Sequence, residues 1–305
     1  MRLADLETAG LLSAAGLTSN GLLSSKASTK QRQCGREVAR VNELKCTSAI
    51  ANYGHLRVVE LARCVWPLAT FGEQMARRTV QRLLRQGLLL ERRNALGSKS
   101  MCLTRTGAAW LDLRGIPAHH TLDLSSVAGP TFFHRTMATR YLIERQVKGC
   151  QVAGEYLILR RKLPFNIDGL AKALQKLPDG LVWQRKADGR TVVEFVEQEA
   201  APKARAEIER CLRAAEYVGV AMSTDGKVRL GGVVFVFDET LNHARRLLLA
   251  ADSLWSGRSS AERETLERRV KLVAVTLREP LVWVGHSVTT LHELRERRIK
   301  PVAIR

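Results

Sequence analysis

The sequence predicts an α+β protein with two domains, a small helical domain closed by a β-hairpin and a larger domain of mixed strands and helices. Apolar residues recur at helical spacing between Arg36 and Gln86, and short apolar strands alternate with helical stretches after residue 131. Gly129-Pro130 stands between the two patterns. The chain has 305 residues, of which 45% are hydrophobic, which suits two globular domains with real cores.

Three helices open the predicted first domain, at residues 36–53, 56–66 and 71–86. Each is followed by a glycine or a proline, residue types that end helices. Residues 1–33, rich in Ser, Ala, Leu, Thr and Gly, are expected to form a flexible N-terminal arm. The third helix has an apolar stripe along its inner face, made of Ala76, Val80, Leu83 and Leu84.

A β-hairpin is expected directly after the third helix. Its strands are residues 88–93 and 101–104, and the turn between them contains Asn, Gly and Ser. A helix at residues 105–113 would pack the hairpin back on the core. Three helices followed by a basic-tipped hairpin is the order of a winged helix-turn-helix domain, which we predict for residues 34–118.

The basic residues of this domain gather on the third helix and the hairpin. Residues 32–114 carry fifteen Lys or Arg against six Asp or Glu. Such a surface fits a groove of double-stranded DNA, although an ordinary solvated helix can also carry three arginines. We predict that Arg78, Arg82 and Arg85, at i, i+4 and i+7, contact DNA with Arg77 beside them, together with Arg92, Arg93 and Lys99 of the hairpin.

The charge of the whole chain favours the same partner. The formal net charge is +19, which attracts polyanions such as nucleic acids. A ribosomal or membrane-surface protein is the alternative explanation of this charge. The six cysteines are scattered singly and are expected to be reduced. No apolar run approaches the about 20 residues of a membrane span. We therefore expect a cytoplasmic protein without a membrane partner.

The second domain, expected at residues 131–290, follows a linker at residues 119–130 and precedes a basic C-terminal tail at residues 291–305, which is expected to be an exposed helix or an extended segment. Strands and helices alternate along it, which predicts a mixed sheet with helices on its faces. The expected strands are residues 155–160, 180–184, 191–198, 228–237, 272–277 and 281–284. The expected helices after the first are residues 202–218, 241–254 and 261–269.

The first helix of this domain, residues 132–147, has one unusual position. Phe133, Met137 and Tyr141 share a stripe, and the next position of that stripe is Glu144. Carboxylates rarely point into a core, so Glu144 either has a special role or reaches the helix edge and pairs with a neighbouring arginine.

Three further acids are expected to meet at the open end of a hairpin. If residues 187–189 form its loop, counting back along both strands places Asp179 opposite Glu197. Alternation puts Glu199 on the same face as Glu197. Like charges at this separation repel unless a cation lies among them, and Mg²⁺ or Mn²⁺ prefers carboxylate oxygens. The alternative is an ordinary turn and a solvated strand end.

This segment resembles the PD-(D/E)XK nuclease core, with Pro178-Asp179-Gly180 followed by an acid-ending strand and a long helix. The order of elements over residues 36–240 resembles the replication-relaxation family and the restriction-endonuclease-like plasmid mobilization relaxases. The resemblance implies a restriction-endonuclease-like α/β domain behind the winged helix. It also implies a metal-dependent DNA nickase or relaxase in plasmid replication or conjugative mobilization, with mobilization or replication proteins as partners and a homodimer as one arrangement.

Carried over residue by residue, the resemblance implies that Asp179 and Glu197 are catalytic acids that bind Mg²⁺ or Mn²⁺, with Glu144 from the first helix and Glu199 as further ligands. The sequence departs from the family at Glu199, where the family has a lysine. The candidates for the missing cation lie in the following segment, namely Lys203 and Arg210.

The absence of that lysine equally suits a non-catalytic DNA-binding regulator or replication accessory protein with a degenerate nuclease-like domain. A covalent relaxase of the HUH class is disfavoured because its two His ligands flank one residue, whereas His119 and His120 are adjacent. No Walker A motif is present. Three tyrosines remain as nucleophiles in principle, although their positions are typical of core residues: Tyr141, Tyr156 and Tyr217.

Overall fold

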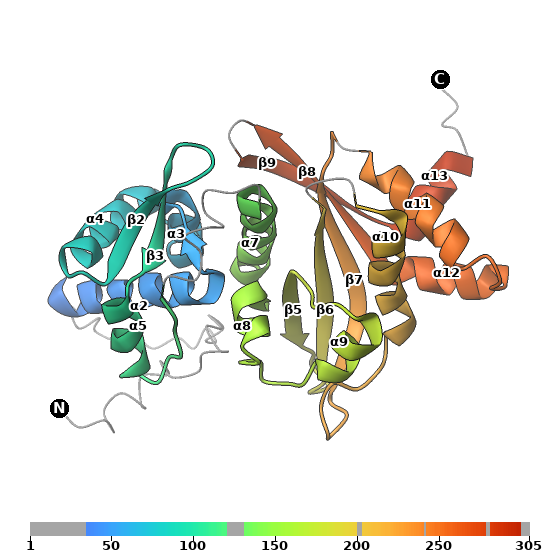
Figure 1. Cartoon of the computed structure of the whole chain (residues 1–305), viewed down its shortest axis with the longest axis horizontal. Coiled ribbons are helices and arrows are strands. Elements are labelled where there is room, and N and C mark those ends of the chain that lie inside the picture. The colour runs from blue at the N-terminus through green and yellow to red at the C-terminus, as the bar shows by residue number, and fades with distance from the viewer. Residues whose placement is uncertain (1–34, 121–130, 200–202, 241, 279–280, 300–305) are drawn as a thin grey trace, which may run out of the picture. The chain divides into compact units, whose positions relative to one another are not determined.

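The computed structural model describes residues 35–120, 131–199, 203–240, 242–278 and 281–299, and it divides into two compact units (Figure 1). The first unit comprises residues 1–129 and 143–151, and the second comprises residues 130–142 and 152–305. The predicted N-terminal arm, most of the predicted linker and the last six residues lie outside the described residues. None of the described helices is both long enough and apolar enough to cross a membrane.

The first unit contains the helices and the hairpin that the sequence predicts. A two-residue strand, β1, follows the first helix and joins the hairpin, so the sheet has the order β1-β3-β2. Because His55 and Leu56 belong to β1, the second helix begins two residues later than expected. The elements are α2 (Gly35–Tyr53), β1 (His55–Leu56), α3 (Val58–Val65), α4 (Gly72–Arg85), β2 (Leu89–Arg93), β3 (Lys99–Leu103) and α5 (Arg105–Asp112).

The core of this unit follows from the apolar stripe of α4. Ala76, Val80 and Leu83 are buried as predicted, whereas Leu84 is only half-buried. Helix α5 begins at a cap, since the Thr104 hydroxyl accepts a hydrogen bond from the backbone N–H of Gly107. A glycine is required at position 107 because the backbones of Gly107 and Leu88 lie so close that a Cβ would overlap the backbone of Leu88. The hairpin and α5 are therefore held tightly together.

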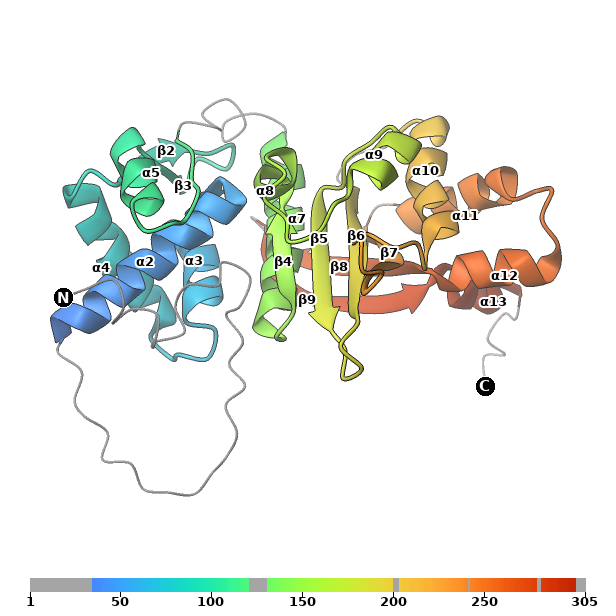
Figure 2. The same cartoon turned by 90° about the horizontal axis from the view of Figure 1, so that it is seen from below.

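The second unit is built on one six-stranded sheet of order β4-β5-β6-β7-β8-β9 (Figure 2). Strands β5 and β6 are antiparallel, β6, β7 and β8 are parallel, and β9 returns antiparallel to β8. The strands are β4 (Gln151–Gly154), β5 (Gly180–Arg185), β6 (Thr191–Glu199), β7 (Val228–Asp238), β8 (Val270–Arg278) and β9 (Val282–Thr290). The helices are α7 (Thr131–Val147), α8 (Glu155–Leu159), α9 (Asp168–Leu174), α10 (Arg205–Leu212), the 3₁₀ helix η1 (Arg213–Tyr217), α11 (His243–Leu254), α12 (Ser260–Arg268) and α13 (Leu291–Ile299).

The hairpin register predicted from the sequence is confirmed. Arg185 pairs with Thr191 and Gly180 pairs with Val196, so the next positions outward are Asp179 and Glu197. The loop closes because Gly189 adopts a φ of 81°, a left-handed conformation that glycine reaches without strain. Loop length and turn residue together therefore determine which acids meet.

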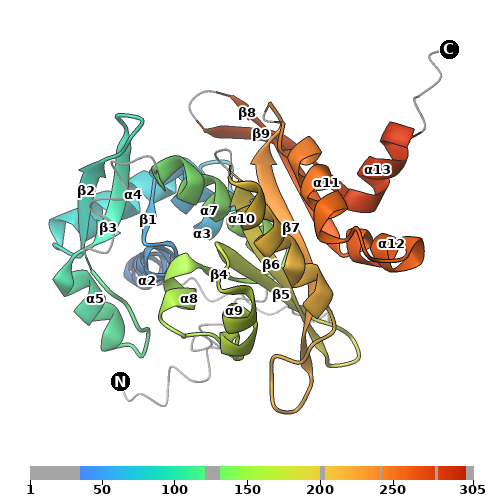
Figure 3. The same cartoon turned by 45° about the vertical axis from the view of Figure 1, so that its right-hand side comes forward.

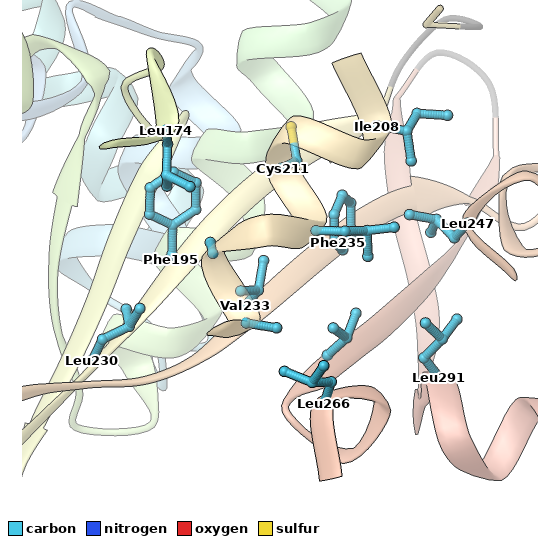
Figure 4. Close-up of a cluster of buried hydrophobic side chains, with 14 of the residues drawn as sticks. Leu174, Phe195, Ile208, Cys211, Leu230, Val233, Phe235, Leu247, Leu266 and Leu291 are labelled. Carbon is cyan, nitrogen blue, oxygen red and sulfur yellow. The ribbon is translucent and has the colours of Figure 1, made fainter. Parts of the chain in front are cut away.

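Helices cover both faces of the sheet. One face packs on α9 to α13 through a continuous apolar cluster, in which Phe195 and Phe235 lie among leucines from several helices (Figure 4). Figure 3 shows α11, α12 and α13 beside this part of the sheet. The opposite face receives α7, because the Leu142 side chain lies over Gly180 and Met137 Sδ accepts a hydrogen bond from the Gln198 amide.

Several expectations for this unit are wrong. Residues 155–160, expected as a strand, begin with helix α8, and the strand β4 lies directly before it. Helix α9 was not expected at all. Phe133, expected on the buried stripe of α7, is 39% exposed, and Phe132 is buried instead. Residues 291–299 form helix α13, which was one of the two alternatives for the C-terminal tail, but its first residue, Leu291, is buried in the core and not exposed.

Candidate functional site

The exposed face of α4 is the first candidate site. Arg78 and Arg85 are exposed, as predicted for residues that contact a ligand. Arg77 is exposed as well, and its guanidinium forms an ion pair with Glu73 on the preceding turn. Two of the four predicted helix arginines thus lie on the surface without a described ion pair, and the third has a partner on its own helix.

Arg82 is placed differently from the prediction. Its Nε lies 2.9 Å from the Glu43 carboxylate on α2, and its guanidinium also donates to the Thr79 hydroxyl at 3.3 Å. Glu43 is buried, so this ion pair joins α2 to α4 inside the unit. Arg82 is therefore half-exposed and has a partner inside the first unit, and its contact with DNA stays a prediction.

The hairpin between β2 and β3 offers a second basic surface. Arg92 and Arg93 are exposed, and Lys99 lies 2.7 Å from Glu91 on the opposite strand. The Asn94 amide stabilises the turn by donating to the hydroxyls of Ser98 and Ser100 at 2.9 and 3.1 Å. A held turn of this kind keeps the exposed arginines in a defined place.

The second candidate site is the acidic cluster at the open end of the β5 and β6 hairpin. Asp179 directly precedes β5, while Glu197 and Glu199 are the last inward-facing residues of β6. Glu197 and Glu199 are almost completely buried, at 0% and 1% exposed. The sequence therefore placed the three acids in the right part of the fold.

Two lysines accompany these acids. The Lys176 ammonium forms an ion pair with Glu197 Oε2, and it lies 3.2 Å from Cys211 Sγ. The Lys203 ammonium donates to Glu199 Oε1 at 2.9 Å and lies 3.6 Å from Glu197 Oε2. Of the two cations considered from the sequence, the structure brings Lys203 to the acids.

Lys176 was not predicted as a member of this cluster. It follows α9, a helix that the alternation of strands and helices did not reveal, and Gln175 turns the chain there with a φ of 51°. The one signal in the sequence is its position three residues before Asp179. A basic residue so close to a predicted acidic cluster is a natural candidate partner for it.

Burial and charge give the acids different proton affinities. Burial raises the pKa of Glu197 to about 7, the Asp179 charge raises it too, and Lys176 and Lys203 oppose both. Burial also raises the pKa of Glu199, against the opposing charge of Lys203. Perturbed carboxyl groups of this kind are typical of functional sites, although ion-pair networks produce them as well.

The pKa of Asp179 is shifted in the opposite direction to those of Glu197 and Glu199. Burial raises the pKa of its carboxyl, but hydrogen bonds and the neighbouring charges of His134 and Lys176 outweigh burial, so the pKa is lowered. His134 on α7 lies 3.2 Å from Asp179 Oδ1, and the backbone N–H of Gln198 donates to Oδ2 at 2.8 Å. Asp179 is thus held as a carboxylate from two sides.

Glu144 has an ion-pair partner of its own. It belongs to the part of α7 that lies in the first unit, where Arg63 of α3 donates to both of its oxygens at 3.0 and 2.7 Å. This ion pair is the arginine pair that the sequence offered as the alternative, and the role of Glu144 as a metal ligand stays a prediction.

The acidic cluster was also considered for a metal ion. Within the described part of the chain, no three His, Cys, Asp or Glu side chains are arranged so that they could hold one. Two buried oxygens in the cluster, Glu197 Oε1 and Glu199 Oε2, accept no hydrogen bond there. These oxygens have the chemistry that Mg²⁺ and Mn²⁺ prefer, whereas the lysines already neutralise part of the charge.

Comparison of the chain with protein-family models, with curated proteins and with solved structures found no match.

Proposed function

We propose that this protein binds double-stranded DNA through its first unit and cleaves one DNA strand at the acidic cluster of its second unit, using Mg²⁺ or Mn²⁺. The observation that carries the proposal is the meeting of Asp179, Glu197 and Glu199 with two lysines at the end of paired strands. The resemblance to plasmid relaxases implies that the protein acts in plasmid replication or mobilization in the cytoplasm of a bacterium. Replication or mobilization proteins, and a second copy of the chain, are the expected partners.

The first unit supports DNA binding by the order of its elements and by its charge. Three helices precede a hairpin, as in winged helix-turn-helix domains, and the third helix and the hairpin both expose arginines. Arginine suits phosphates and guanine bases because its planar group donates two parallel hydrogen bonds.

The second unit supports the nuclease hypothesis by its topology. The Pro178-Asp179 corner leads into an antiparallel strand pair, and α10 then connects β6 to the parallel strand β7. This order is the one expected from the resemblance to the PD-(D/E)XK core. Such a likeness of arrangement supports the proposal at the level of fold, and the site residues must carry the chemistry.

The residues divide the chemistry between them. Asp179, Glu197 and Glu199 are the residues that would hold a divalent ion, although within the described part of the chain their carboxylates are not arranged as a three-ligand site. The bound ion supplies Lewis-acid charge and lowers the pKa of an attacking water. Lys176 and Lys203, 19% and 15% exposed, stabilise the negative charge of a phosphodiester that enters the site. His134 keeps Asp179 in its ionised form and in position.

A second function is favoured by a specific observation. Lys176 and Lys203 already pair with Glu197 and Glu199, so the buried acids are neutralised without any metal. This arrangement suits a DNA-binding regulator whose nuclease-like unit has a structural role. The two functions predict different products from the same DNA.

The test compares the parent with Asp179→Asn, Glu197→Gln and a control, Asp188→Asn, on supercoiled plasmid that carries the native replicon or transfer origin. Asp188 is an exposed acid of the hairpin loop that pairs with Arg190, away from the cluster. We expect Mg²⁺- or Mn²⁺-dependent open-circular product from the parent and the control, and nicking by the two variants that is slower by roughly tenfold or more. Products are also examined for a protein–DNA adduct, which would indicate a covalent tyrosine mechanism.

Binding without nicking under any divalent metal would establish the regulator. Nicking by the Asp179 and Glu197 variants at the parental rate would show that the acids were wrongly assigned.

A further inference from the structure

One face of α4 presents a regular row of side chains with hydrogen-bonding groups suited to bases. Gln74, Arg78, Gln81 and Arg85 recur at i, i+4, i+7 and i+11, a spacing that keeps them on one side of a helix. All four are exposed. This row differs from the arginine stripe expected from the sequence, because Arg82 is drawn away by Glu43. We call these four residues the Gln/Arg row.

An exposed aromatic residue lies at the start of the same row. Phe71 directly precedes the first helical residue and stands three positions before Gln74, and its side chain is 68% exposed. A phenylalanine in water forgoes the free energy that burial of its ring would provide, on the order of 2 kcal/mol. A ligand with an apolar group at this end of the helix would cover it.

The residue types of the row are those that distinguish bases. A glutamine amide can donate to and accept from the two Hoogsteen-edge atoms of adenine, and an arginine donates twice to guanine. Phenylalanine makes apolar contact with the methyl group of thymine. Lysine, which favours phosphates as a point charge, is absent from the row.

We propose that the Gln/Arg row lies in the major groove and determines the DNA sequence that the protein prefers. Gln74 and Gln81 each select an adenine, Arg78 selects a guanine between them, and Phe71 selects a thymine at one end. This inference rests on the proposed binding of DNA by the first unit. Gln74 and Gln81 are separated by about 10 Å along the helix axis, which corresponds to roughly three base pairs.

Charge decides between DNA and another protein as the occupant of this face. The row contains two arginines, and the one acid beside it among the described residues of α4, Glu73, is paired with Arg77. The exposed hairpin arginines Arg92 and Arg93 add positive charge to the same unit. A polyanion with polar base edges matches this composition better than an apolar protein surface does.

The test is selection of binding sites from a random duplex pool by the full-length protein, in EDTA so that no strand is cut. The variants are Gln74→Ala, Arg78→Ala, Gln81→Ala and Phe71→Ala. The matched control is Gln86→Ala, an exposed glutamine at the end of α4 that lies outside the row. Circular dichroism verifies that each variant is folded, as expected for exposed positions.

We expect the parent and Gln86→Ala to select one motif that contains adenine and guanine. Each of the four variants should lose preference at one position of that motif and bind the parental site roughly tenfold more weakly, since a good base contact discriminates by about 1–3 kcal/mol. A second substitution at Gln81 tests for a change of specificity, because Gln81→Arg should change the selected base at its position from adenine to guanine.

The outcomes separate this inference from the function on which it rests. Selection of the parental motif by all row variants, or binding by the parent without any base preference, overturns the assignment of the row while DNA binding stands. Absence of duplex binding by the parent overturns both.

Discussion

At the scale of single residues, Gly107 shows how little space separates α5 from the strand region before it. A methyl group at this position would overlap the carbonyl of Leu88, which is backbone and cannot rotate away. We expect Gly107→Ala to lower the free energy of unfolding of the first unit by about 2 kcal/mol, within the range for overpacked sites.

Urea unfolding followed by circular dichroism measures this change, with Gly35→Ala as the control. Gly35 lies at the start of α2, and a Cβ there meets no atom within 4 Å. Equal stability of the two variants would contradict the close packing described for α5.

Residue positions in the acidic cluster were predictable only where local geometry determines them. The three-residue loop ending in Gly189 sets the hairpin register, so Asp179 and Glu197 could be paired from the sequence. The partners of these acids depend on tertiary contacts. Lys176 follows a short helix that has no strong periodic pattern, and His134 belongs to α7, which is far from the acids in the sequence. No spacing rule connects either residue to the acids.

At the scale of elements, the β2 and β3 hairpin is expected to act through charge. Arg92 and Arg93 are exposed at the end of β2, next to the turn in which Asn94 donates to Ser98, and this position suits contact with phosphates. We expect the double variant Arg92→Gln, Arg93→Gln to reduce the slope of log K against log salt by roughly 0.9 for each phosphate that the hairpin no longer neutralises. The preferred DNA sequence should stay the same, because phosphate contacts do not distinguish bases.

Fluorescence anisotropy over a series of salt concentrations measures the slope. The control is the double variant Arg36→Gln, Arg40→Gln, which removes the same charge from the exposed start of α2. A salt slope that changes as much in the control as in the hairpin variant would assign the effect to net charge alone.

Elements with a strong period were predictable, and short apolar runs were not. The stripe of α4 spans several turns and indicated the correct helix and the correct inner residues Ala76, Val80 and Leu83. Residues 155–159 form an apolar run too short for its period to distinguish a strand from a helix. Gly154 in an extended conformation and the acidic Glu155 in the first turn favour the helix that is observed.

At the scale of the whole molecule, the first unit also contains residues 143–151, which follow its main segment in the sequence. Tyr53 donates to the Gln146 side chain at 3.0 Å, Arg63 pairs with Glu144, and Ile143 is fully buried. A fragment of residues 30–118 contains α2 to α5 and the hairpin, so we expect it to fold and to bind duplex DNA. Its melting temperature should be lower than that of a fragment of residues 30–151, because the latter retains these partners.

Thermal melting by circular dichroism and a gel-shift assay with each fragment test this expectation. An unfolded 30–118 fragment would mean that residues 143–151 are indispensable to the core. Equal melting temperatures would mean that their contacts contribute nothing to stability.

The division into two units was partly predictable from the sequence. The Gly129-Pro130 pair, and the change from helices closed by one hairpin to alternating strands and helices, marked the boundary that separates residues 1–129 from residue 130 onward. The return of residues 143–151 to the first unit was not predictable, since α7 is a single uninterrupted helix. A periodic pattern identifies a helix, but it carries no information about which core each turn joins.

The division of α7 between the units has a consequence for the ancestry of the protein. A gene segment ending near residue 118 encodes the third helix and the hairpin of the first unit, but it omits Glu144 and Gln146, on which Arg63 and Tyr53 depend. A recombination event at the apparent boundary would therefore transfer an incomplete module into a new gene. Exchange of the whole stretch through residue 151 avoids this defect, but it carries part of the second unit along. Recombination is thus expected to keep the two units in one reading frame.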